Sequence, residues 1–364
     1  MISFAAPAAS MFAMENYLQQ AAAAGLADRI RLLAYEDIFA HHELPVGSCV
    51  LSGIDRLTPV GCTIIARCRD ELVRATRDVV VLNDPRCSLG RHDLLRLAFE
   101  TGGNQFRAVR APGLLRGLRF PVFVRSEREH TGSLTSLIDS PVGLGRELLL
   151  LCLRGYRLQD LLIVEYCNTS DADGVFRKYS AFIVGGQIIP RCLELSHHWV
   201  TKSEHRIIDE QTAEEEFHYV THNPHEDWLR ETFRLARVEY GRIDYALLAG
   251  KPQVWEINVA PTIGGRPGGG PPSARTDAQR LMLAPTRDHF YREFRAALER
   301  LDRPVAPSRT VTIAISPAEA AQLRHELQTI RRVQDRQTIL SQLSRPPIQL
   351  VKRVITRWQA RAAP

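Results

Sequence analysis

Paired cysteines and long apolar runs are both missing from this 364-residue sequence. Its seven cysteines are scattered, odd in number and without a CxxC pair, which argues against a disulfide framework or a zinc knuckle and favours a reducing compartment. The strongest apolar run, LLLLCL at 148–153, is far too short to span a bilayer. The first residues lack the basic start of a signal peptide. We therefore expect a cytoplasmic protein without a transmembrane segment.

Neither sign of charge dominates the body of the chain. The net charge is +6, but residues 304–364 contain ten Lys or Arg against three Asp or Glu, so the remainder is close to neutral. Apolar residues make up 45% and charged residues 24% of the chain, which is ordinary for a folded enzyme and argues against disorder. The length allows two or three lobes with cores of their own. We expect no nucleic-acid partner.

Strand-like and helix-like segments alternate along most of the sequence. The sequence contains no internal repeat. Residues 1–85 predict an N-terminal α/β lobe with a parallel sheet, in which 14–26 is helical and 79–82 is the clearest strand. Residues 86–185 predict a central lobe, and 186–303 a C-terminal lobe. A strand pair is expected around the Gly185-Gly186 turn. Residues 304–364 predict a basic, mostly helical extension. The fold class is α/β.

The strongest chemical signal is a predicted hairpin that carries Asp244 on one strand and Glu256 and Asn258 on the other. Glu256 and Asn258 are two residues apart, so their side chains share a face. If the chain turns near Gly250, Asp244 comes opposite them. Two carboxylates and an amide oxygen suit Mg²⁺. The alternative is an exposed hairpin with solvated acids, which the apolar neighbours of Glu256 disfavour because buried strands rarely carry unpaired acids.

The segment GRIDYALLAGKPQVWEINVAP resembles the metal-binding hairpin of ATP-grasp enzymes, such as glutathione synthetases, D-alanine–D-alanine ligases and the ribosomal-protein glutamate ligases. The resemblance extends from about Val79 to Pro261. It implies an ATP-grasp architecture, in which the N-terminal lobe is joined by two lobes that clasp ATP. It also implies ATP and two Mg²⁺ ions as cofactors, with Asp244, Glu256 and Asn258 as metal ligands.

Further positions match the ATP-binding residues of that family. Arg125 ends a strand where the family has a phosphate-binding lysine, and the loop after it has a single glycine, fewer than is usual. The adenine hinge corresponds to Glu165, Tyr166 and Cys167, where the main chain of Glu165 and Cys167 would bond the base. Asp171 is a candidate for the ribose hydroxyls, although an Asp in a turn is also common for local reasons.

Basic residues on the next two strands are expected to stabilise the transferred phosphate. Lys178 and Arg191 are the catalytic candidates, and Arg177 adds positive charge beside them. Lys178 is also expected to contact ATP, and Lys202 is a further basic candidate. A solvated strand face is the alternative. Ser180 stands where many relatives carry arginine. The glycine-rich run 264–270 would face the second substrate, or else be a linker.

The resemblance implies an ATP-dependent ligase that joins a small-molecule or peptide carboxylate to an amine through an acyl phosphate. Two alternatives stay open. One is an ATP-grasp kinase that stops after phosphorylation. The other is an inactive nucleotide-binding adaptor, which Ser180, Arg125 and the glycine-poor loop favour and the intact acids disfavour.

The C-terminal extension matches no part of the ATP-grasp core. Its last part places Ile348, Val351, Ile355 and Trp358 at helical spacing, with basic residues between them. Such a helix could pack on the body, join two subunits as a homo-oligomer or lie on an anionic surface.

Overall fold

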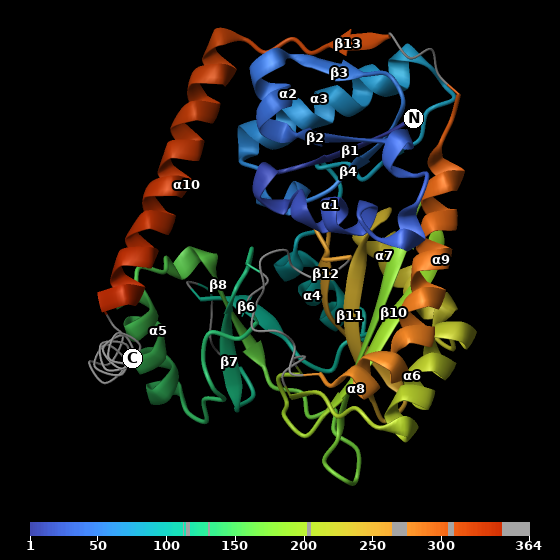
Figure 1. Cartoon of the computed structure of the whole chain (residues 1–364). Helices are drawn as coiled ribbons and strands as arrows, with labels where there is room; N and C mark the ends of the chain where they lie inside the picture. Colours follow the sequence, from blue (N-terminus) through green and yellow to red (C-terminus); the bar gives the residue numbers. More distant parts are fainter. Residues whose placement is uncertain are drawn as a thin grey trace, which may run out of the picture.

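The computed structural model describes residues 1–111, 113, 117–129, 132–201, 205–263, 275–304 and 309–343. Figure 1 shows an N-terminal lobe lying over two further sheets, with a long helix along one side. The N-terminal sheet is parallel and the other sheets are antiparallel, so the predicted α/β class is confirmed. All seven cysteines are free thiols. Among the described residues, the helices are too short or too polar to cross a membrane.

The N-terminal lobe is built on a four-stranded sheet in the order β2-β1-β4-β5. Its strands and helices are β1 (Ile2–Ala6), α1 (Phe12–Leu18), β2 (Ile30–Ala34), α2 (Tyr35–His41), β4 (Ser48–Leu51), α3 (Pro59–Ala75) and β5 (Val81–Leu82). Helix α3 starts because the Thr58 side chain caps it and Pro59 occupies its first position. Ile64, Cys68 and Leu72 of α3 are fully buried, so this face closes the core over the sheet.

The beginning of the C-terminal extension is part of this lobe. Strand β13 (Thr310–Thr312) pairs with β3 (Glu43–Pro45), and Ile313 is buried behind it. Helix α10 (Pro317–Leu343) is tied to α3 by an ion pair of 2.7 Å between Arg67 and Glu319. Leu323 is buried against the same core. The chain from residue 309 to about 326 therefore completes the N-terminal lobe.

The central lobe contains a three-stranded antiparallel sheet in the order β6-β8-β7. Its elements are α4 (Arg91–Glu100), β6 (Ala108–Arg110), β7 (Val122–Ser126), α5 (Pro141–Leu153) and β8 (Leu161–Glu165). Helix α5 buries Leu144 and Leu151 against this sheet. Helix α4 contacts both β6 and β12, so it connects the central lobe to the next sheet.

The C-terminal lobe is a four-stranded antiparallel sheet in the order β10-β9-β11-β12. Its elements are β9 (Phe176–Val184), β10 (Gln187–Ser196), α6 (Glu210–His222), α7 (Glu226–Ala236), β11 (Tyr240–Leu248), β12 (Lys251–Asn258), α8 (Asp277–Met282) and α9 (Ala284–Leu301). Helix α7 buries Leu229, Phe233 and Ala236, one stripe of an amphipathic helix. The predicted strand pair around Gly185-Gly186 is confirmed.

The expected boundary between the two clasping lobes falls inside that strand pair. Strands β9 and β10 lie in one sheet with β11 and β12, and residues 185 and 186 form only the turn between them. We propose that the boundary lies before β9 instead.

The hairpin of β11 and β12 turns on two residues, Ala249 and Gly250. Both have positive φ, 48° and 77°, as a two-residue turn of the primed type requires. Such a turn matches the right-handed twist of the flanking strands and fixes their register. The predicted turn near Gly250 is therefore confirmed. Between Tyr245 and Asp244 the register shifts by one residue at Trp255, and this irregularity brings Asp244 opposite Glu256.

Candidate active site

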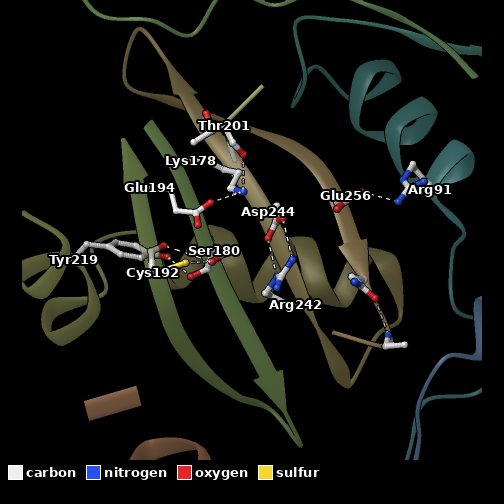
Figure 2. Close-up of polar contacts among 12 residues, drawn as sticks. Arg91, Lys178, Ser180, Cys192, Glu194, Thr201, Tyr219, Arg242, Asp244 and Glu256 are labelled. Atoms are coloured by element: carbon white, nitrogen blue, oxygen red, sulfur yellow. Dashed lines mark hydrogen bonds and ion pairs between the residues drawn. The ribbon is translucent and has the colours of Figure 1, made fainter. Parts of the chain in front are cut away.

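The hairpin register brings the two predicted carboxylates together. Asp244 on β11 pairs directly with Glu256 on β12, and Arg242 pairs with Asn258. Asp244 is only 7% exposed. Figure 2 shows both carboxylates projecting from neighbouring strands of the sheet. The predicted apposition of Asp244 and Glu256 is confirmed, and Asn258 lies one step further along β12.

Both carboxylates are paired with arginines. Asp244 accepts hydrogen bonds of 2.9 and 3.2 Å from Nε and Nη2 of Arg242. Glu256 Oε2 accepts one of 2.6 Å from Nη2 of Arg91 and another from Arg125 (Figure 2 shows the bond from Arg91). The charges of the two acids are therefore balanced within the site.

Arg91 was missed from the sequence. It is the first residue of α4, its side chain is 3% exposed, and its Nη1 donates to the carbonyls of Ser126, Glu127 and Glu129 at 2.7 to 2.9 Å. Burial lowers the pKa of Arg91 against the effect of Glu256. Arg91 thus ties the loop after β7 to β12. One signal in the sequence could have indicated Arg91. A cation at the first position of a helix is unfavourable because it opposes the helix dipole, so an arginine there suggests a role outside the helix.

A cavity of about 280 Å³ lies between the β7–β8 end of the central sheet and the face of β9, β11 and β12. Six predicted site residues line it, namely Arg125, Tyr166, Cys167, Lys178, Asp244 and Glu256. Arg177, which was expected to add positive charge beside the nucleotide, also lines it, and so does Arg242, which was not predicted. Among the described residues, this cavity therefore combines four cationic side chains with two carboxylates, a composition suited to a polyanion bound with a metal.

Aromatic side chains form the other wall of the cavity. Trp199 packs against Phe123 and Tyr166 at centroid distances of 5.1 and 5.8 Å. Trp255 stacks on Phe106 at 4.7 Å. An apolar wall beside a charged floor suits a planar base attached to phosphates.

Of the three residues predicted as the adenine hinge, Glu165 has a buried side chain, and Tyr166 and Cys167 line the cavity. The Glu165 side chain is about 1% exposed and accepts hydrogen bonds from Arg107 and Arg119. Burial alone would raise the pKa of Glu165, but the hydrogen bonds from Arg119 and Arg107 hold it below its usual value. This side chain ties β8 to the neighbouring loops, and Tyr166 and Cys167 reach the cavity.

Lys178 lies in the cavity and pairs across the strands with Glu194. Its Nζ is 2.6 Å from Glu194 Oε2 and donates to the Thr201 carbonyl at 3.2 Å. Burial would lower the pKa of Lys178, but Glu194 and Asp244 raise it overall. Lys178 is therefore charged near neutral pH and lies close to Asp244.

Besides Glu165, three predicted residues do not line the cavity, namely Arg191, Asp171 and Asn258. The register of β10 shifts between Pro190 and Cys192, and the Arg191 guanidinium lies over the Phe290 ring at 4.5 Å. Asp171 accepts hydrogen bonds from the main-chain N–H groups of Asp173 and Val175, and pairs with Arg177.

Asn258 is the last of the predicted site residues that do not line the cavity. Its Oδ1 accepts from the Ala260 N–H at 2.8 Å. Lys202 and the glycine-rich run 264–270 lie outside the described residues.

The residues present fit a divalent cation through two of the three predicted ligands. Within the part of the chain that the structure describes, no three His, Cys, Asp or Glu side chains gather as a metal site. Asp244 and Glu256, however, face each other and line one cavity. Mg²⁺ is commonly held by one or two carboxylates, with phosphates and water completing its shell, so the donor chemistry is sufficient.

The fold is similar to that of ATP-grasp ligases over about four fifths of the chain. The ATP-grasp ligase PsnB, in complex with a minimal precursor, is 12% identical, with 82% of this chain and 98% of that chain covered and a TM-score of 0.47. A D-alanine–D-alanine ligase from Bacillus anthracis is 12% identical, with coverages of 82% and 98% and a TM-score of 0.44; a complex of that ligase with ATP also matches.

An L-amino acid ligase from Bacillus licheniformis is 10% identical, with 73% of this chain and 67% of that chain covered and a TM-score of 0.41. PsnB has also been solved with Mg and ADP. No protein-family model matches the sequence, and no curated protein matches it significantly.

Proposed function

We propose that this protein is an ATP- and Mg²⁺-dependent ligase that joins a carboxylate to an amine. One observation carries the proposal. Asp244 and Glu256 face each other on adjacent strands, in a cavity that also contains Arg125, Lys178 and Arg242. Opposed carboxylates among several cations suit a metal-bound triphosphate.

Asp244 and Glu256 would hold Mg²⁺, and we keep Asn258 as a third ligand in the proposal. Bound there, Mg²⁺ supplies positive charge to the phosphates of ATP. Arg125 and Lys178 would bind the phosphates from two sides, since they come from different sheets. Arg242 would replace Arg191 as the cation nearest the reacting group, because it contacts Asp244 directly. Tyr166 and Cys167 would bind the adenine beside Trp199.

The proposed reaction has two steps. An oxygen of the substrate carboxylate attacks the γ-phosphorus and the bond to ADP breaks, which gives an acyl phosphate. The amine nitrogen then attacks the acyl carbon, the bond to phosphate breaks, and the amine loses a proton. The residues of the cavity act by positioning and by neutralising charge, so no side chain has to act as a nucleophile.

The reaction class can be tested by incubating the full chain with Mg-ATP and pools of amino acids or short peptides. A ligase should release ADP and phosphate in equal amounts only when a carboxylate and an amine are both present, and EDTA should stop the release. ADP without phosphate, from a single acceptor, would show a kinase instead. An inactive adaptor would bind ATP and release neither product.

Two replacements of Arg125 should show whether ATP binding depends on its positive charge or on the shape of its guanidinium group. Arg125→Ala should weaken ATP binding about 10–100-fold, the loss expected for a charge-assisted hydrogen bond. Arg125→Lys should retain most of the affinity, since the positive charge remains. Calorimetry with ATP measures both.

The matched control is Arg110→Ala, on the same sheet but outside the cavity, where Arg110 pairs with Glu127. The control should bind as the wild type does. Wild-type affinity in Arg125→Ala would exclude Arg125 from the phosphate site.

A further inference from the structure

Helix α5 is apolar on both of its faces. Leu144 and Leu151 on the inner face are buried against the central sheet. On the opposite face, Val142 is 84% exposed, Leu149 61% and Leu153 64%. These three side chains are spaced by seven and four residues, so they form one stripe along the helix. We call Val142, Leu149 and Leu153 the outer stripe of α5.

An exposed apolar stripe of this kind needs a partner. A helix that is hydrophobic all round is normally buried on all sides, and contiguous apolar patches mark contact surfaces. Ten large apolar side chains are exposed among the described residues. Three of them form the outer stripe, and a fourth, Leu158, follows α5 directly. The concentration on one element separates this stripe from the isolated exposed side chains that every surface carries.

Helix α10 leads the chain from the N-terminal lobe toward this region. Near its start it is fixed to α3 through Glu319, which pairs with Arg67, and through Glu326, which accepts from the Val60 N–H at 3.3 Å. Its 27 residues correspond to a length of about 40 Å. Figure 1 shows α10 running from the N-terminal lobe down toward the side of the molecule where α5 lies.

A second apolar stripe is available in the same chain. Twenty-one residues follow the end of α10 at Leu343, and they lie outside the described residues. Their sequence repeats Ile348, Val351, Ile355 and Trp358 at helical spacing. The catalytic proposal uses neither this stripe nor that of α5. As a helix, the segment from Ile348 to Trp358 would rise about 15 Å, close to the rise of about 16.5 Å from Val142 to Leu153.

We propose that residues 346–361 dock in cis on the outer stripe of α5, with Ile348, Val351, Ile355 and Trp358 against Val142, Leu149 and Leu153. The tether raises the local concentration of the segment over that of any free partner. Docked this way, α10 and the C-terminal segment form a strap from the N-terminal lobe to the central lobe, which carries Arg125. The proposal stands independently of the reaction class.

Hydrogen exchange of α5 tests the docking. The full chain is compared with a chain that ends at Leu343, which retains β13 and all contacts of α10 named above. Removal of the segment should speed the exchange of the α5 amides by about tenfold or more, because a covered helix opens less often. Leu149→Glu and Leu153→Glu in the full chain should have the same effect, without a further increase when combined with the truncation.

The control variant is Phe217→Glu, a comparably exposed apolar position on α6, at 41%. It should leave α5 exchange unchanged. A second measurement uses Trp358: its emission, taken as the difference between the full chain and Trp358→Phe, should be blue-shifted and should move to longer wavelength in Leu149→Glu.

Three results would overturn the proposal. One is α5 exchange that is equal with and without the segment. Another is a dimer in light scattering that dissociates in Leu149→Glu, since a second copy would then cover the stripe. The third is binding to anionic vesicles that is lost in Leu149→Glu, since the stripe would then contact lipid. A monomer in every variant, with the exchange changes above and no vesicle binding, supports docking in cis.

Discussion

Replacing Glu256 by Gln should lower ADP formation roughly 10²–10³-fold or more, the range seen when one preorganised electrostatic contact to a reacting phosphate is removed. Gln keeps an oxygen that can accept from Arg91 and Arg125, which both donate to Glu256. The variant therefore removes one negative charge with little change in packing. Glu256→Ala should be equally inactive, but it also leaves the buried Arg91 without its carboxylate partner.

Calorimetry distinguishes loss of metal binding from loss of folding. Glu256→Gln should unfold at the wild-type temperature and bind Mg-ADP more weakly, whereas binding of ADP with EDTA should change little. Glu100→Gln, on the exposed end of α4 where Glu100 pairs with Arg96, is the matched control and should be fully active. Near-normal turnover by Glu256→Gln would remove the metal assignment and the ligase proposal with it.

The acidic hairpin could be predicted from sequence because its determinants are local. Alternation of apolar and polar residues sets which side chains share a face, and the two-residue turn at Ala249 and Gly250 sets the register next to it. The register shift at Trp255 that completes the pairing of Asp244 with Glu256 was not predicted. Asp244 and Glu256 are twelve positions apart and still come face to face. The hinge strand and the strand ending at Arg125 were predicted for the same reason.

Residues that depend on irregular or tertiary structure were not predictable. Arg191 was expected to point into the site by alternation, but the register shift beside it redirects its side chain toward α9. Arg91 enters the site from a helix about 165 positions before Glu256, which no local pattern records. Arg242 was within the recognised motif, but its contact with Asp244 follows from side-chain packing.

Intrinsic propensity misled the prediction of the first helix. The alanine-rich stretch 14–26 was expected to be one helix, but α1 ends at Leu18 and a short 3-10 turn follows at Ala21–Ala23. Ala23 and Leu26 are fully buried, and the chain has to turn inward to bury them. Burial of these residues outweighs a preference worth only a few tenths of a kcal/mol per residue.

The largest effect on stability is expected at Glu216 on α6. Glu216 pairs with Arg206, and the two side chains are 3% and 6% exposed. Burial raises the pKa of Glu216 in spite of the opposing effect of Arg206. Glu216→Ala should destabilise the protein by about 3–5 kcal/mol, because it removes the ion-pair partner of a buried guanidinium. The corresponding fall in melting temperature is roughly 6–10 °C, measurable by scanning fluorimetry.

The double variant Arg206→Met with Glu216→Leu should recover most of that loss, because an apolar pair of similar volume avoids the cost of burying two charges. Glu215→Ala, next to Glu216 but in a pair with Arg177 that is about one third exposed, should cost less than about 1 kcal/mol. A melting temperature of Glu216→Ala within 2 °C of the wild type would contradict the prediction.

The double variant also shows whether Arg206 affects the candidate active site through its charge or by holding β10 in place. Arg206 donates to the Leu193 carbonyl on β10, beside the Glu194 that pairs with Lys178. If the ion pair matters only because a lone charge is costly, the double variant should bind ATP as the wild type does. Weakened ATP binding in a double variant of restored stability would instead assign Arg206 the role of holding β10, and through Glu194 the position of Lys178.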